Sequence, residues 1–290
     1  MNNYIRTVCE INGLKYISSK PVSGGDINAS YAITTSEGQL FLKLNTAKDF
    51  PEMFAKEAEG LKALQQASLL KIPAVVAMGE LEDKQYLLLE MLEKAQPSIG
   101  FWDKFAEGLA SLHHLTNNTF GFTSFNYIGS LVQQNNMCKT WAEFYATERI
   151  MPLVKKLFNN HSITINDVNA AEKLCNNLQN IFPVEASALL HGDLWAGNFM
   201  AVKTNEATQV TASIYDPAVY YGHREMDIGM SSLFGGFDNR FYEAYHHYYP
   251  LEKDWRKRVS LTQLYPLLVH AILFGGGYIS RCSSILHDWK

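Results

Sequence analysis

Hydrophobic and polar residues alternate with a period of two along several stretches of the first ninety residues, a pattern typical of half-buried β-strands. Turn residues separate these stretches. A first stretch precedes the turn residues at 23–28, and the others lie at 30–35, 39–44, 74–77 and 85–90. Apolar residues also recur at positions 54, 58, 61 and 64, which is the spacing of an amphipathic helix. We therefore expect this part of the chain to consist of strands around one helix.

Beyond residue 98 the spacing of apolar positions becomes helical, with short β-like pieces only between 189 and 216. Helices are predicted over 101–115, 141–157, 167–178, 226–234 and 265–278. The apolar stretch 266–279 is shorter than the roughly 20 residues of a membrane span, so we interpret it as a buried helix.

A short polar linker at 94–97 separates the part with strand-like periodicity from the part with helical periodicity. We predict an α+β fold of the bilobal, protein-kinase-like type, with a small β-rich lobe at residues 1–92 and a larger, mainly helical lobe at 93–290. A hinge is expected near residues 90–98. A cleft between two lobes is a usual place for a ligand.

Composition excludes several classes of protein. The chain has 290 residues, a net charge of -4 and 47% hydrophobic residues, so a disordered chain and a nucleic-acid-binding surface are both disfavoured. The most basic run, 253–258, contains an acid and is interpreted as a solvated helix face. Four cysteines without a C-x-x-C pair, and no secretory segment, favour a cytoplasmic protein that has reduced thiols and no membrane partner.

The sequence His-Gly-Asp-Leu-Trp-Ala-Gly-Asn at residues 191–198 holds the first candidate chemistry. Asp193 and Asn198 have the D-x-x-x-x-N spacing of a phosphotransferase catalytic loop, in which the Asp orients a hydroxyl and the Asn binds Mg²⁺. Gly197 provides backbone freedom for the turn before the Asn. Such a spacing is common by chance, so its context has to support it.

A second aspartate lies where a strand predicted over 213–215 ends. Asp216 would be the second Mg²⁺ ligand, because carboxylate and amide oxygens are the hard donors that Mg²⁺ prefers. The alternative is a turn residue in front of Pro217.

Lys43 lies in an otherwise apolar predicted strand, either as an edge lysine that points to solvent or as the lysine that neutralises nucleotide phosphates. Glu57, in the one predicted helix of this lobe, is expected to pair with it, because a buried ammonium without a partner is costly. Glu52 and Glu59 compete for that role, and Glu59 is expected to face water.

Two further segments are candidates for nucleotide binding. Ser23, Gly24 and Gly25 do not form a Walker or G-x-G-x-x-G motif, but two glycines between strands expose N–H groups that bind phosphate, or they form a plain turn. The lobe junction Glu90-Met91-Leu92 would offer backbone groups to adenine.

Candidate substrate-binding residues surround the two aspartates. Trp195 would stack on a sugar or on an amine-linked group, or pack in the core. Tyr221, His223, Arg224 and Glu225 are polar and follow the metal aspartate, where substrate would approach; Arg224 and Glu225 could alternatively form ion pairs within the lobe. Asp227 is expected to cap a helix or to bind the loop backbone. We interpret His113, His114, His246 and His247 as packing or surface residues.

These residues resemble the fructosamine kinase (ketosamine-3-kinase) family, within the aminoglycoside-phosphotransferase-like branch of the protein-kinase-like fold. The 191–198 motif marks the wider group, and the Asp-Pro-Ala…Tyr-Tyr-Gly-His-Arg-Glu stretch that starts at Asp216 narrows the resemblance to fructosamine kinases. Matching stretches elsewhere are 23–25, 41–45, 120–122, 126–129, 141–144 and 233–237.

The resemblance implies ATP-dependent, Mg²⁺-dependent phosphorylation of the 3-hydroxyl of a fructosamine or ribulosamine, free or protein-linked. It makes Asp193 the proton acceptor, Asn198 and Asp216 the metal ligands, and Lys43 the phosphate lysine. Some members carry a cysteine in the glycine-rich loop that links subunits, whereas this chain has Asp26 after Gly25. We therefore expect a monomer or a weak dimer without that redox control.

Two alternatives remain open at the level of sequence. The same machinery could phosphorylate an aminoglycoside, choline or another small hydroxyl substrate, or the chain could be a catalytically silent nucleotide-binding regulator. The presence of Lys43, Asp193, Asn198 and Asp216 disfavours the regulator, which would be expected to lack at least one of them.

Overall fold

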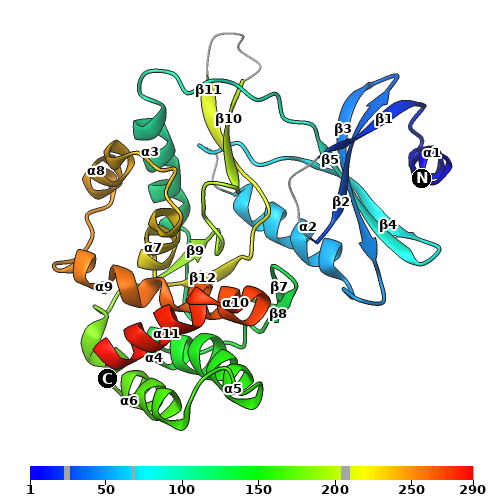
Figure 1. Ribbon diagram of the computed structural model, residues 1–290. Coiled ribbons are helices and arrows are strands. Elements are labelled where there is room, and N and C mark those ends of the chain that lie inside the picture. Colours follow the sequence, from blue (N-terminus) through cyan, green and yellow to red (C-terminus); the bar gives the residue numbers. More distant parts are fainter. Residues whose placement is uncertain (23–26, 67–68, 204–209, 290) are drawn as a thin grey trace.

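The computed structural model describes residues 1–22, 27–66, 69–203 and 210–289, and it shows a small sheet-containing part beside a larger helical part (Figure 1). The small part is built on one antiparallel sheet with the strand order β1-β2-β3-β5-β4. The strands are β1 Tyr16–Val22, β2 Ala29–Thr35, β3 Gly38–Thr46, β4 Val75–Leu81 and β5 Lys84–Glu90. The predicted strands are therefore confirmed, and the ends of those with predicted bounds differ by a few residues.

Successive side chains of the central strand β3 point to opposite faces of the sheet, and a different helix covers each face. Leu42 and Leu44 point to the face covered by α1 (Asn2–Ile11), with which they share an apolar cluster. Lys43, one residue out of phase, points to the other face, where it contacts α2 (Met53–Leu64). β3 lies between β2 and β5 and is not an edge strand, and Lys43 is buried against Glu57 and Asp216. The interpretation as a solvent-facing edge lysine is therefore wrong.

Helix α1 corrects the prediction that this part contains one helix. Ile5, Val8 and Cys9 are fully buried and have the i, i+3, i+4 spacing of one helix face. The helix is short, and its stability comes from packing that face on the sheet more than from intrinsic propensity. The sequence did not predict this helix, because its apolar periodicity spans only one turn and is surrounded by polar residues.

The larger part of the chain is mainly helical and carries three small antiparallel sheets, ordered β12-β9-β6, β10-β11 and β7-β8. The strands are β6 Thr116–Asn117, β7 Asn126–Ile128, β8 Leu131–Gln133, β9 Ser187–Leu190, β10 Phe199–Lys203, β11 Val210–Ile214 and β12 Tyr220–Gly222. The helices are α3 Phe101–His113, α4 Trp141–Phe144, π-helix η1 Tyr145–Ile150, α5 Met151–Asn159, α6 Ile165–Ile181, α7 Glu225–Leu233, α8 Asn239–Tyr248, α9 Trp255–Thr262, α10 Leu264–Phe274 and α11 Gly277–Asp288.

One apolar cluster joins the two parts, so that α2 belongs to both. Phe54 and Leu61 of α2 share this cluster with Phe105 of α3 and Ile214 of β11. At Gly60 of α2, an added Cβ would lie 3.3 Å from side-chain atoms of Pro217 and of Val219. The helix that faces Lys43 therefore rests directly on the segment that follows Asp216.

The apolar run 266–279 does not form one helix, which corrects the prediction over 265–278. Helix α10 ends at Phe274, and α11 begins at Gly277. Gly275 (φ 65°, ψ −141°) and Gly276 (φ 60°, ψ −138°) between them adopt conformations that are open essentially to glycine alone. Among the described residues, no helix has both the length and the apolar character needed to cross a membrane.

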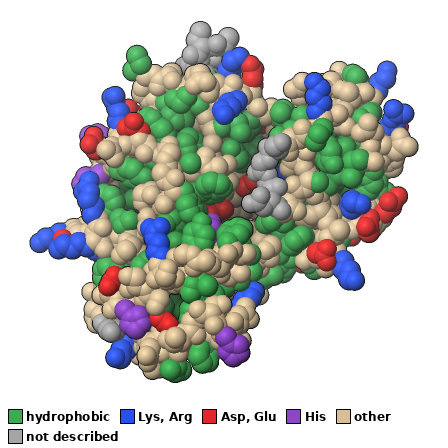
Figure 2. Space-filling view, viewed as in Figure 1, with side chains coloured by type: hydrophobic (Ala, Val, Ile, Leu, Met, Phe, Trp, Pro, Cys, Tyr) green, Lys and Arg blue, Asp and Glu red, His purple; other side chains and the backbone are tan. Residues whose placement is uncertain are grey.

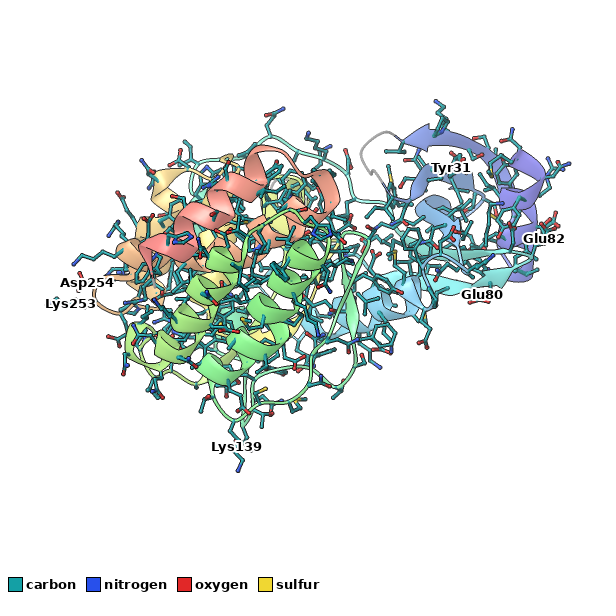
Figure 3. The ribbon with its side chains drawn as sticks, turned by 60° about the horizontal axis from the view of Figure 1, so that its bottom comes forward. Tyr31, Glu80, Glu82, Lys139, Lys253 and Asp254 are labelled. Atoms are coloured by element: carbon teal, nitrogen blue, oxygen red, sulfur yellow. The ribbon has the colours of Figure 1, made fainter. Side chains whose placement is uncertain are left out.

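The basic run at 253–258 is only partly a solvated face. Lys253 and Asp254 lie at the periphery of the helical part and point outward (Figure 3). Arg258 is instead buried, with its Nη2 2.6 Å from Oε1 of Glu225. The prediction is wrong for Arg258, because an internal carboxylate neutralises it.

The break between α10 and α11 at Gly275–Gly276 predicts a stability effect that depends on the backbone conformation and not on the room available for an added side chain. Nothing lies within 4 Å of a Cβ added at Gly276 or at Gly277, but only Gly276 has a positive φ. We expect Gly276→Ala to lower the free energy of unfolding by about 1–3 kcal/mol, because alanine is strained there. The control Gly277→Ala lies at the start of α11 and should be neutral or stabilising by up to about 1 kcal/mol. Urea unfolding of both variants measures this, and equal effects would contradict it.

Candidate active site

The 191–198 loop leaves β9 and enters β10, and its first turn requires glycine. Gly192 has φ +83°, and a Cβ there would lie 2.0 Å from the carbonyl oxygen of Ala218. The N–H of Ala218 donates to the carbonyl of His191 at 2.9 Å. The loop is therefore held against the backbone just after Asp216.

Asp227 of α7 fixes the same turn from behind. Its carboxylate accepts the backbone N–H of His191 at 2.8 Å and that of Gly192 at 3.0 Å. The prediction that Asp227 binds the loop backbone is thus confirmed. Nε2 of His113 lies 3.2 Å from the same carboxylate, and burial lowers the pKa of that histidine. His113 is accordingly a packing residue of the core, as expected.

Asp193 and Asn198 face each other across the loop. The amide nitrogen Nδ2 of Asn198 donates to Oδ2 of Asp193 at 3.0 Å and to its backbone oxygen at 2.9 Å. Among the described residues none donates to the amide oxygen Oδ1 of Asn198, so this oxygen is available to a cation. The bonds also hold the Asp193 carboxylate at one position.

Asp216 follows β11 in a left-handed conformation, with φ 56°. Non-glycine residues in this region are uncommon and often have a functional reason. The side chain is 45% exposed, and Oδ1 accepts a hydrogen bond from Nζ of Lys43. Its backbone oxygen lies 3.5 Å from Nδ2 of Asn198. Asp216 is therefore not an isolated turn residue but the link between the loop and Lys43.

Lys43 donates to Oε1 of Glu57 at 2.7 Å, which confirms the predicted pair. Of the two competitors, Glu59 instead binds Lys56 at 3.1 Å and the hydroxyl of Ser124 at 2.7 Å, and Glu52 is exposed just before α2 begins. Burial disfavours the Lys43 ammonium, but the carboxylates of Asp216 and Glu57 outweigh it and raise its pKa. The lysine is therefore a fixed cation.

The environment also tunes the Asp193 carboxyl. Burial raises its pKa to about 7, the charges of Asp216 and Asp227 act in the same direction, and the Asn198 hydrogen bond opposes them. A carboxylate whose pKa lies near neutrality is suited to accept a proton at physiological pH.

The oxygens of Asn198 and Asp216 fit a hard divalent cation. The carboxylate of Asp216 is half-exposed, Oδ1 of Asn198 is available, and both residues line the same cavity. The described residues contain no cluster of three or more His, Cys, Asp or Glu that could hold a metal alone. A Mg²⁺ ion held by two side chains takes its other ligands from phosphate and water.

A cavity of about 700 Å³ connects these groups. Figure 2 shows it as a hollow near the centre of the molecule, bordered by hydrophobic side chains. The predicted residues that line it are Lys43, Glu57, Asp193, Trp195, Asn198 and Asp216. Its volume is within the ~300–1,000 Å³ typical of ligand sites.

The model of the family described as fructosamine kinase matches residues 4–290, nearly the whole chain. A "Probable ketoamine kinase" of Enterococcus faecium is 36% identical over 276 residues, which are 93% of this chain and 94% of that protein. The chain belongs to the fructosamine kinase family. It is thus an ATP-dependent kinase.

This fructosamine kinase family member is also similar to a plant protein and to a bacterial protein of known structure. It is 35% identical to a "Protein-ribulosamine 3-kinase, chloroplastic" of Arabidopsis thaliana, over 92% of this chain and 81% of that protein. The crystal structure of a "putative fructosamine-3-kinase" from Thermobifida fusca superposes with a TM-score of 0.87 at 31% identity, over 99% and 98% of the chains.

An aminoglycoside phosphotransferase, APH(4)-Ia, has a TM-score of 0.61 at 14% identity, over 99% of this chain and 98% of that one. At that identity the likeness shows the fold alone. The predicted kinase-like α+β fold is therefore confirmed for this family member.

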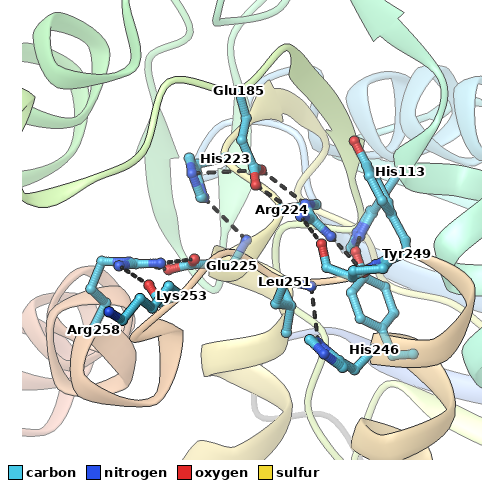
Figure 4. Close-up of polar contacts among 12 residues, drawn as sticks. His113, Glu185, His223, Arg224, Glu225, His246, Tyr249, Leu251, Lys253 and Arg258 are labelled. Atoms are coloured by element: carbon cyan, nitrogen blue, oxygen red, sulfur yellow. Dashed lines mark hydrogen bonds and ion pairs between the residues drawn. The ribbon is translucent and has the colours of Figure 1, made fainter.

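The structure does not bring His223, Arg224 and Glu225 to the cavity, which corrects their assignment to substrate binding. They are almost fully buried in a charged cluster with Glu185 and Arg258 (Figure 4). Arg224 binds both carboxylate oxygens of Glu185 at 2.8 Å, and Arg258 binds both oxygens of Glu225 at 2.6 and 2.8 Å. These are the ion pairs that the alternative interpretation named. Each buried charge has a partner of opposite sign, which offsets the cost of its lost hydration.

Tyr221 also does not line the cavity as the structure defines it. It lies in β12, where its backbone pairs with Leu189 and bridges to Gly121. Its position in the sequence was a poor guide, because the chain turns into β12 and away from the cavity soon after Asp216.

The structure describes only one of the two segments that the sequence predicts to bind the nucleotide. Ser23, Gly24 and Gly25 lie outside the described residues. Residues 90–92 form the junction between β5 and the segment leading to α3, and Met91 and Leu92 are half-buried. They do not border the cavity, which extends from Lys43 toward α10 instead. Their adenine contact stays a prediction.

Sequence reasoning missed the β7–β8 hairpin as part of the site. Asn126 lines the cavity, and its Nδ2 donates to the carbonyl of Val219 at 2.7 Å. Gln133 donates to the carbonyl of Ala218 at 3.0 Å. Buried polar side chains thus hold the backbone that follows Asp216. Period-two alternation over three residues is too short a signal to find such a hairpin, although 126–129 is one of the family-like stretches.

The buried His223 predicts a loss of stability in acid. Burial lowers its pKa to about 4, the nearby Arg224 and Arg258 charges act in the same direction, and Glu185 opposes them. The unfolded chain takes up this proton near pH 6.5, so folding loses about 3 kcal/mol as the pH falls from 6.5 to 4. We expect His223→Gln to lack this part of the decrease in urea unfolding measured across that range.

His247→Gln is the matched control, because His247 is an exposed histidine of α8. It should keep the pH profile of the unmodified protein. Identical profiles for His223→Gln and the unmodified protein would show that His223 is not held neutral by its surroundings.

Proposed function

We propose that the protein transfers the γ-phosphoryl group of ATP to the 3-hydroxyl of a ketosamine, a fructosamine or ribulosamine. The observation that carries the proposal is the convergence of Lys43, Asp193, Asn198 and Asp216 on one cavity. These residues come from three separate stretches of the chain. Together they offer a proton acceptor, two metal-binding oxygens and a fixed cation.

Each residue has one role in the proposed reaction. Asp193 accepts the proton of the attacking hydroxyl, whose oxygen bonds to the γ-phosphorus while the bond to the β-phosphate oxygen breaks and ADP leaves. Lys43, oriented by Glu57, offsets negative charge on the nucleotide phosphates. Asn198 keeps the Asp193 carboxylate in position through its amide nitrogen.

Asn198 and Asp216 are the residues that would hold Mg²⁺, which supplies charge neutralisation of the transferring phosphate when bound. Lys43 contacts Asp216 directly, so a nucleotide phosphate bound by Lys43 would lie beside the proposed Mg²⁺ ligand Asp216. We propose that residues 1–92 bind the nucleotide, with Ser23, Gly24 and Gly25 at the phosphates and Glu90, Met91 and Leu92 at adenine. Residues 93–290 would hold the catalytic and substrate groups.

The charge of the cavity favours a ketosamine over an aminoglycoside. Its described lining contains only three carboxylates, namely Glu57, Asp193 and Asp216, and all three belong to the phosphoryl-transfer groups. A polycationic drug would find no further acid among these described lining residues, whereas a ketosamine carries a single amine. The names of the ketoamine and ribulosamine kinases among the relatives support the same substrate class.

Replacing the proposed proton acceptor tests the mechanism. We expect Asp193→Asn to lower kcat by ~10²–10⁴-fold, because general-base assistance is lost while the shape is kept. ADP release in the presence of a ribulosamine measures kcat, and a thermal melt checks folding. The control Asp83→Asn changes an aspartate whose side chain is 72% exposed in the turn between β4 and β5, and it should leave kcat unchanged. Normal turnover of Asp193→Asn would remove this residue from the mechanism.

The metal role of Asp216 has its own readout. We expect Asp216→Ala to abolish activity at ordinary Mg²⁺ concentration and to weaken Mg²⁺ binding in the presence of ADP, because one of two protein oxygens is lost. Titration of activity and calorimetric Mg²⁺ binding measure the two effects. Full activity with unchanged Mg²⁺ affinity would rule out the ligand role.

A further inference from the structure

One wall of the cavity is made of aromatic side chains that no proposed catalytic role uses. Only five aromatic side chains of Phe, Trp and Tyr are exposed among the described residues, and three of them, Trp195, Phe234 and Phe274, line this cavity. Exposed aromatics that gather at one place mark a binding surface more often than scattered ones do. Here they border the same space as Asp193.

The rings form a continuous chain that leads away from the reaction centre. Trp195 is 5.9 Å from Phe234 between ring centroids, and Phe234 is 4.9 Å from His270. His270 then lies 5.4 Å from Phe274 and 5.1 Å from Tyr278. This row of rings begins at Trp195, two residues from Asp193, and ends beside the Gly275–Gly276 break, so it extends along the cavity wall away from the proposed proton acceptor.

His270 contributes a neutral ring to this wall. Its Nδ1 donates to the carbonyl of Pro266 at 2.7 Å, and burial lowers its pKa. The ring therefore adds no positive charge at neutral pH. The three carboxylates of the described lining all lie at the phosphoryl-transfer end, so this wall offers flat apolar faces and no negative charge.

We propose that Phe234, His270, Phe274 and Tyr278 bind a flat apolar group attached to the nitrogen of the ketosamine. This inference rests on the proposed function and adds that the amine-linked part of the substrate, and not only its sugar, sets specificity. Aromatic faces bind such a group by offset or edge-to-face packing. A cavity of about 700 Å³ has room for that group beside the sugar.

The test compares two substrates that differ only in the amine-linked group, the ribulosamines of methylamine and of benzylamine, with the matching fructosamines as a second pair. We expect kcat/KM to be ~2- to 12-fold higher for the benzylamine derivative, the factor that one aromatic contact provides. Phe274→Ala and Phe234→Ala should each lower this ratio. The change should appear as a higher KM for the benzylamine derivative, because uniform binding is lost.

Phe158→Ala is the matched control, because Phe158 of α5 is 38% exposed, as Phe234 is, but does not line the cavity. It should keep the ratio of the unmodified protein. Phe234 and Phe274 are both exposed, so we expect their alanine variants to fold. A thermal melt checks this.

Each outcome separates this inference from the proposed function. Turnover of both derivatives with equal kcat/KM, or an unchanged ratio in both wall variants, would overturn the inference and leave the ketosamine kinase activity standing. Absence of turnover on every ketosamine, with folded protein and Mg²⁺-ATP present, would overturn both.

Discussion

The buried ammonium of Lys43 is the interaction on which the arrangement of the site depends. It lies on the α2 face of the central strand and contacts Glu57 on one side and Asp216 on the other. A buried cation is tolerated only when such partners compensate its lost hydration. The contact therefore ties the sheet, α2 and the segment after β11 to one point.

Close packing supports that ion pair from the apolar side. Gly60 allows α2 to approach Pro217 and Val219, and the β7–β8 hairpin binds the carbonyls of Ala218 and Val219 from beneath. Asp227 meanwhile fixes the turn at His191 and Gly192. The helix and the hairpin contact the segment that follows Asp216, whereas Asp227 holds the loop that carries Asp193. A displacement of α2 would therefore move Asp216 relative to Asp193. The geometry of the site is thus a property of the packing between the two parts.

Position along the chain is an incomplete guide to function, as the polar groups at the cavity and the buried charged cluster around Glu185 show. Asp216 and His223 are seven residues apart and both follow β11. One is half-exposed at the cavity, whereas the other is buried with Glu185 and has its pKa lowered by desolvation. The intervening strand β12 carries the chain away, and no local pattern in the sequence reports that turn.

Local sequence determined the elements whose signals are short-range. Period-two alternation predicted the sheet, helical spacing predicted α2, α3 and α6, and the D-x-x-x-x-N spacing marked Asp193 and Asn198 because one loop holds both residues. The pair of Lys43 and Glu57 also followed from the rule that a buried ammonium needs a partner. Helix α1 and the burial of Arg258 did not follow, because each depends on what a distant segment packs against it. The break at Gly275–Gly276 did not follow either, because the apolar run continues through the two glycines and does not report their backbone conformation. The aromatic wall likewise exists only in three dimensions, since Trp195, Phe234 and His270 come from three separate segments that long-range packing brings to one cavity.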